Sequence, residues 1–92
     1  MKNKSLEEIE ELVKQGDLEA MCELAYRKFE GEGTEKDYKG AFELYKQASE
    51  RGSIKATYNL GNSYYYGDGT EQDWNEAFKL YEKASSKGND NA

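Results

Sequence analysis

The stretch that decides the fold is GEGTEKDYKGAFELYKQA, residues 31–48. It recurs 36 residues later as GDGTEQDWNEAFKLYEKA, residues 67–84. When residues 20–55 are aligned with 56–91, 14 of the 36 positions are identical, whereas ordinary composition would give about two or three. A period of about 20 to 50 residues is typical of stacked helical hairpins. The repeat therefore predicts a solenoid and not a single enclosed core.

Capping residues and glycines predict where the helices begin and end. Ser5 and Glu8 form a capping box that starts a first helix, and Gly16 ends it because glycine enters the left-handed conformation without steric cost. Four more helices are expected over about 18–30, 38–51, 54–66 and 74–87, with the caps Asp17, Asp37, Ser53 and Asp73. Gly88 is expected to stop the last one. The predicted fold class is all-α, with about five helices in antiparallel hairpins and no strand.

The first helix matches the second half of a hairpin. Its pattern residues lie 36 positions before their equivalents, which pair Leu6 with Phe42, Ile9 with Tyr45 and Gly16 with Gly52. We expect it to cover the N-terminal end of the stack with its EEIEE surface toward water, because repeat stacks need polar end caps. This divides the chain into a capping helix (1–16), two hairpins (17–52 and 53–88) and a tail or start of a further repeat (89–92).

The second hairpin carries a spaced pattern of alanine, leucine, glycine and tyrosine. It reads A-x-x-x-L-G-x-x-Y-x-x-G-x-G from Ala56 to Gly69, and it continues with Asp73, Ala77, Leu80, Tyr81, Ala84 and Gly88. This pattern resembles the Sel-one-like repeat. The 36-residue period, the G-x-G loop and the absence of proline favour it over the related tetratricopeptide repeat, which runs about 34 residues. The resemblance implies a right-handed superhelix and a role as an adaptor for other proteins.

The first hairpin departs from this pattern at three positions. Ala25 replaces a glycine, Lys28 replaces the packing tyrosine, and Gly40 lies inside a helix, where glycine costs about 1 kcal/mol relative to alanine. We expect Phe29 to replace the missing tyrosine ring after a small rotation of the helix.

Composition and charge exclude several classes of protein. The net charge of −6 and the pI of about 4.7 argue against a nucleic-acid partner, whose phosphates would repel the chain, and mildly favour cationic partners. The single Cys22 excludes an internal disulfide framework. No apolar run has the length of a signal peptide or the ~20 residues of a membrane span. We therefore expect a cytoplasmic protein with no membrane partner.

No motif indicates catalysis, a cofactor or a metal. The two G-x-G loops lack the preceding strand and longer glycine pattern of a phosphate loop, and Asp68, Glu71 and Asp73 do not follow the order of a calcium loop. The chain has no histidine, so a nucleophilic triad has no base. The resemblance also brings a remote alternative, since some cysteine-rich relatives are associated with β-lactam binding or hydrolysis. This sequence lacks their paired cysteines and a Ser-x-x-Lys element.

Residues that differ between the repeats predict a display surface. In superhelical stacks the first helix of each hairpin lines the concave side. On these helices the scaffold residues repeat, but the residues of one stripe do not. The stripe contains Tyr, Asn and Arg, which are frequent at interfaces. The predicted groove consists of Glu23, Tyr26, Arg27, Glu30, Asn59, Asn62, Ser63 and Tyr66.

The leading hypothesis is a non-enzymatic protein–protein interaction module that presents this groove to a peptide or protein. A second hypothesis is a structural role. Ala92 repeats the opening position of a hairpin, held by Ala20 and Ala56, so the last hairpin has no evident cap. The chain would then be a piece of a longer array, or would self-associate through its C-terminal end.

Overall fold

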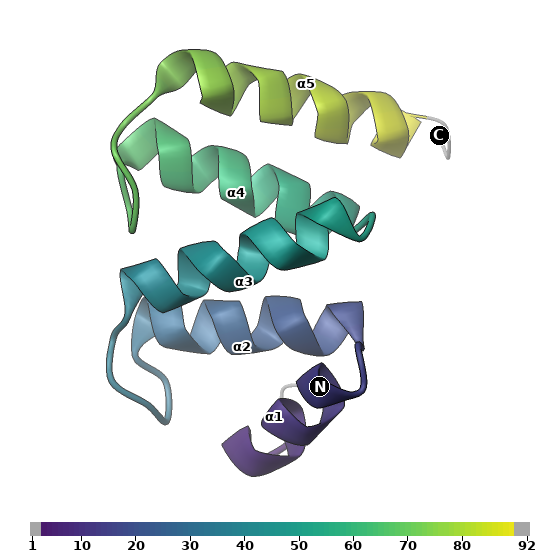
Figure 1. Cartoon of the computed structure of the whole chain (residues 1–92), viewed down its shortest axis with the longest axis vertical. Helices are drawn as coiled ribbons and strands as arrows, with labels where there is room; N and C mark the ends of the chain where they lie inside the picture. The colour runs from purple at the N-terminus through teal and green to yellow at the C-terminus, as the bar shows by residue number, and fades with distance from the viewer. Residues whose placement is uncertain (1–2, 90–92) are drawn as a thin grey trace.

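Five helices stack in chain order along the long axis of the molecule (Figure 1). The computed structural model describes residues 3–89. The helices are α1 (Leu6–Lys14), α2 (Leu18–Glu30), α3 (Tyr38–Glu50), α4 (Ile54–Tyr66) and α5 (Trp74–Asn89). Successive helices run antiparallel, and the described residues contain no strand. The prediction of an all-α helical-repeat solenoid is therefore confirmed.

The helices begin at the expected caps. The Glu8 side chain accepts a hydrogen bond from the Ser5 backbone N–H (2.8 Å), and the Ser5 hydroxyl accepts one from the Glu8 N–H (3.2 Å). The Ser5 N–H, and with it the Ser5 side chain, lowers the pKa of Glu8 because it stabilises the carboxylate. The other caps each accept from the N–H three residues later, at 2.8 to 3.1 Å: Asp17, Asp37, Ser53 and Asp73.

Glycine ends the helices at all but one of the expected places. Gly31 and Gly67 follow α2 and α4 in the left-handed conformation, with φ of 76° and 73°. The prediction that Gly88 stops the last helix is wrong, because α5 runs through it to Asn89. Glycine also tolerates helical angles, so a glycine alone does not end a helix. The predicted role of Ala92 lies outside the described residues.

The repeated residues form the core between the hairpins. Small side chains at the helix crossings let the backbones approach closely, and Ala25, Ala41, Ala48 and Ala56 are almost fully buried. The main cluster consists of Met21, Cys22, Ala25, Ala41, Phe42, Tyr45, Ala48, Ala56, Leu60 and Leu80. A second cluster, in which Ile9 of α1 meets Ala20 and Leu24 of α2, closes the N-terminal end.

Phe29 does not replace the tyrosine ring missing at Lys28. Its ring lies 4.9 Å from Tyr38, the same pairing that Tyr65 makes with Trp74 in the second hairpin. Phe29 therefore has the role of Tyr65, the residue 36 positions later. The Lys28 ammonium instead lies 3.9 Å from the Asp37 carboxylate at the start of α3.

Candidate functional site

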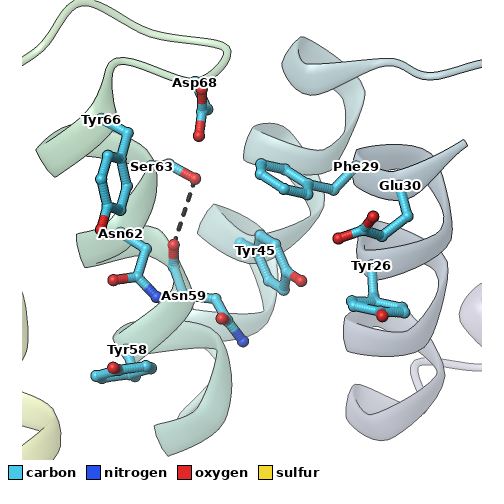
Figure 2. Close-up of a pocket in the computed structure, with 10 residues that line it drawn as sticks. All are labelled: Tyr26, Phe29, Glu30, Tyr45, Tyr58, Asn59, Asn62, Ser63, Tyr66 and Asp68. Carbon is cyan, nitrogen blue, oxygen red and sulfur yellow. Dashed lines mark hydrogen bonds between the residues drawn. The ribbon is translucent and has the colours of Figure 1, made fainter.

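A groove lies between the two parallel helices α2 and α4, and α3 forms its floor (Figure 2). The cavity holds about 340 Å³. Tyr45 of α3 and Phe29 lie between the walls in Figure 2, with α2 side chains on one wall and α4 side chains on the other. Its lining consists of Tyr26, Phe29, Glu30, Tyr45, Tyr58, Asn59, Asn62, Ser63, Tyr66 and Asp68.

The groove continues into a second cavity of about 390 Å³. The two cavities share Tyr26, Tyr45 and Asn59, so they adjoin in the space between α2 and α4. The second cavity adds Cys22, Glu23 and Lys55, which lie nearer the N-terminal ends of α2 and α4.

Seven of the eight predicted groove residues line these cavities. Six line the first cavity, namely Tyr26, Glu30, Asn59, Asn62, Ser63 and Tyr66. Glu23 lines the second. Of the two tyrosines in the set, Tyr66 is the more exposed, at 67% against 44% for Tyr26.

Arg27 is the exception, and its expected place in the groove is corrected. It is only 8% exposed. Its Nε donates to the Glu23 carboxylate at 3.0 Å, and its Nη2 donates to the Lys4 carbonyl at 2.8 Å. Arg27 is equivalent to Ser63 of the second hairpin, and Ser63 faces α2 of the first hairpin. Arg27 therefore faces the side where a preceding hairpin would place its own first helix. There its long side chain holds the segment that leads into α1.

Four residues of the first cavity were not predicted from the sequence. They are Phe29, Tyr45, Tyr58 and Asp68. Tyr45 repeats as Tyr81, so the sequence predicted a core residue, and Tyr45 is indeed part of the core. A buried tyrosine still has a polar hydroxyl, which points toward the nearest cavity. Tyr58 differs from its equivalent Cys22, so the contrast between repeats could have revealed it.

Hydrogen bonds orient the amides on the α4 wall. The Tyr81 hydroxyl donates to Asn62 Oδ1 at 2.5 Å, which leaves the Asn62 amide nitrogen as a donor on the groove side. Asn59 Nδ2 donates to the Lys55 carbonyl (3.1 Å), and the Ser63 hydroxyl donates to the Asn59 carbonyl (3.3 Å, Figure 2). A carbonyl or amide brought to this wall would thus meet groups already held in place.

One end of the groove is negative. Glu30 is the last residue of α2 and Asp68 follows α4, so both carboxylates lie where two parallel helices present their carbonyl ends. Within residues 3–89 neither carboxylate takes part in a salt bridge. On the floor, burial raises the pKa of Tyr45, with smaller contributions from Cys22, Tyr26 and the nearby glutamates. Its hydroxyl therefore stays neutral at physiological pH.

The described part of the chain offers no metal site and no membrane span. Among its His, Cys, Asp and Glu side chains no three are grouped to hold a metal ion. None of its helices has the length and apolar character needed to cross a bilayer.

A family model settles the classification. The Sel1 repeat model matches the chain twice, over residues 18–53 and 54–89. The chain belongs to the Sel1 repeat family. Sel1 repeats are a protein-interaction fold, and their proteins are generally non-enzymatic repeat modules. A search of curated proteins gave no match.

Two solved Sel1-type structures are similar to this chain. The first is c5321, a protective antigen present in uropathogenic Escherichia coli strains that displays the Sel1-like repeat fold, with 38% identity, 94% of this chain covered and a TM-score of 0.90. The second is a Sel1 repeat protein from Oxalobacter formigenes, with 37% identity, 79% of this chain covered and a TM-score of 0.77. The match spans 18% and 30% of those two chains, so this Sel1 chain corresponds to less than a third of either protein.

Proposed function

We propose that this Sel1 chain is a cytoplasmic, non-enzymatic adaptor module that holds an extended peptide of a partner protein in its concave groove. The observation that carries the proposal is the composition of the groove. Its walls combine tyrosine rings and amides at positions that differ between the repeats, on a scaffold whose caps, loop glycines and main packing residues largely repeat. Tyrosine and asparagine supply contact area and adaptable hydrogen bonds at interfaces.

The groove geometry suggests how a peptide is held. The Asn62 amide nitrogen is placed to donate to a peptide carbonyl, and the exposed rings of Tyr26 and Tyr66 offer apolar faces. The Glu30 and Asp68 carboxylates favour a lysine or arginine side chain at the negative end. The net charge of −6 adds a general attraction for such a peptide.

Selection from a random peptide library on the intact protein tests this proposal. The selected peptides should carry a basic residue, and their affinity, measured by fluorescence anisotropy, should fall about tenfold in Tyr66→Ala or Glu30→Gln, as expected for loss of an important contact. Glu43→Gln, on an exposed part of α3 outside the groove, is the matched control. Arg27→Ala is unsuitable because Arg27 anchors the N-terminal segment. Absence of any binder, or equal affinity in all three variants, would overturn the groove assignment.

The proposal includes no catalysis. A nitrocefin assay tests the remote alternative of a β-lactam-hydrolysing relative, and the expected rate is that of buffer alone. Hydrolysis above that rate by the purified chain would contradict a purely adaptor function.

A further inference from the structure

A buried hydroxyl on the floor of the groove has no partner within the protein. The Tyr45 side chain is only 6% exposed, and within residues 3–89 its hydroxyl forms no hydrogen bond. No side-chain oxygen in this part of the chain is both fully enclosed and unbonded, so the hydroxyl opens onto a cavity. Tyr45 lines both cavities of the groove, and Figure 2 shows its hydroxyl between the walls. Because buried polar groups are normally hydrogen-bonded, the partner of Tyr45 has to come from the groove.

The second hairpin shows which internal partner is missing. Tyr81 stands at the repeat position of Tyr45, and its hydroxyl donates to Asn62 Oδ1 at 2.5 Å. The residue equivalent to Asn62 in the first hairpin is Tyr26, whose side chain has no amide oxygen to accept this bond. The first hairpin thus has an aromatic ring where the second has an internal acceptor. This substitution leaves the Tyr45 hydroxyl available to a ligand.

The space in front of this hydroxyl attracts positive charge. Burial is the main cause of the raised pKa of Tyr45, but Glu23 and Glu30 add to it, so their negative potential reaches the hydroxyl. The Glu23 carboxylate is paired with Arg27 at 3.0 Å, whereas Glu30 takes part in no salt bridge within residues 3–89. An anion would be repelled here, and a cation would meet an uncompensated carboxylate.

Aromatic rings border the same space. Tyr26 and Phe29 line the cavity together with Glu30 (Figure 2), and the face of an aromatic ring attracts a cation placed within about 6 Å of its centre. The described residues that line this cavity include no lysine or arginine. Lys55 lines the second cavity instead. We call the set of Tyr26, Phe29, Glu30 and Tyr45 the cation pocket.

We propose that the cation pocket binds the guanidinium group of an arginine in the bound peptide. A guanidinium group carries its N–H donors in one plane. One edge donates to both oxygens of the Glu30 carboxylate, a further N–H donates to the Tyr45 hydroxyl oxygen, and the plane stacks on the Tyr26 or Phe29 ring. A lysine ammonium is more strongly hydrated and has no plane to stack, so it fits this pocket less well. The assignment rests on the proposed role of the groove as a peptide site, and it narrows the basic residue to arginine.

N-acetylarginine N-methylamide, titrated into the intact isotope-labelled protein, is the probe. It should shift the backbone amide resonances of Tyr26, Glu30 and Tyr45 saturably, at millimolar concentration because one side chain makes few contacts. The lysine analogue should bind at least about threefold more weakly. The citrulline analogue has the shape of arginine without its charge, and it should give no saturable shift.

Two conservative substitutions separate the contributions of charge and hydroxyl. Glu30→Gln should weaken binding of the arginine probe about tenfold, because it removes the charge-assisted pair. Tyr45→Phe removes only the hydroxyl and should weaken binding about threefold to fivefold. Glu82→Gln and Tyr64→Phe make the same changes outside both cavities and are the matched controls. The same spectra show whether each variant is folded.

Three results would overturn the arginine assignment. They are the absence of any saturable shift with the arginine probe, a lysine analogue that binds as tightly as the arginine probe, and equal binding of the arginine probe by Tyr45→Phe and Tyr64→Phe. Peptides selected from the library could still bind the groove in each case, so the peptide-binding function would stand. The reverse outcome, a saturable arginine site in a protein that selects no peptide, would overturn the peptide-binding function and leave the contacts of the pocket in place.

Discussion

The two hairpins carry the same residues at many positions but bury them differently. Phe42 is 9% exposed, whereas its repeat Phe78 is 55% exposed. The helix that carries Phe42 has packed neighbours on both sides, and the helix that carries Phe78 packs on α4 alone among the described residues. Burial at this repeated position is therefore decided by the next hairpin and not by the hairpin that supplies the residue.

The loop glycines show the same rule in the opposite direction. Gly33 and Gly69 both have positive φ, 75° and 79°. Nothing lies within 4 Å of a Cβ built on Gly33, but one built on Gly69 meets the backbone of Tyr38. The second loop rests on the hairpin before it, while the first loop has no such hairpin beneath it.

Truncation of the two phenylalanines should give the largest difference. Phe42→Ala removes a buried ring from the core and its contact with Tyr64, so it should cost about 3 to 4 kcal/mol in the free energy of unfolding. Phe78→Ala removes an exposed ring and should cost less than about 1 kcal/mol. Urea unfolding followed by circular dichroism measures both. Similar losses would break the comparison, because they would show that Phe78 is covered in solution.

Alanine at the two loop glycines should give the next largest difference. Each substitution forces a side chain into the left-handed region, at about 1 to 2 kcal/mol. Gly69→Ala must in addition move the loop away from Tyr38, which adds about 1 to 3 kcal/mol of overpacking. Thermal unfolding of the matched pair should therefore rank Gly69→Ala well below Gly33→Ala. Equal midpoints would mean that the loop yields without loss of stability.

The repeated tyrosines Tyr45 and Tyr81 should differ at alkaline pH. Burial raises the pKa of Tyr45 in the folded state above the value of about 10 expected in the unfolded chain. The contribution of the neutral Tyr45 hydroxyl to the free energy of unfolding is complete below about pH 10. This contribution is lost as the pH rises further, because only the unfolded state releases the proton. Tyr45→Phe should reduce the loss of stability between pH 8 and pH 11 by about 1 kcal/mol.

Tyr81→Phe is the matched variant for this pH test. Burial raises the pKa of Tyr81 too, but its side chain is only partly buried and its hydroxyl bonds Asn62. Its effect on the pH dependence should be the smaller of the two. The measurement is urea unfolding at pH 8 and pH 11. An unchanged pH dependence in Tyr45→Phe would contradict the burial argument.

Local signals in the sequence predict most of the fold. Ser5, Asp17 and Ser53 cap helices by contacts within three residues, and such contacts depend only on neighbouring sequence. Gly88 lies at the repeat position of Gly52, but it does not end its helix. Glycine tolerates both the helical and the left-handed conformation, so the surrounding structure decides which one it adopts.

The candidate site was less predictable because its walls come from separate hairpins. The contrast between repeats identified residues that do line the groove, such as Tyr66 and Asn62. It misplaced Arg27, whose contact with Lys4 spans 23 positions and follows no periodicity. The contrast between repeats did not identify Tyr45, because the same residue type stands at both repeat positions. Such a position indicates packing and gives no sign of the cavity beside it.

Each helix makes its main contacts only with the helices next to it in sequence: α1 with α2, α2 with α3, α3 with α4, and α4 with α5. Local unfolding at either end therefore leaves the remaining stack paired. Unfolding of α3 would instead leave α1–α2 and α4–α5 as two separate pieces. The reason is that α3 residues connect the two sides of the main core cluster. Because neither piece retains the main core cluster, the amide protons of α3 should be among the slowest of the molecule to exchange with solvent.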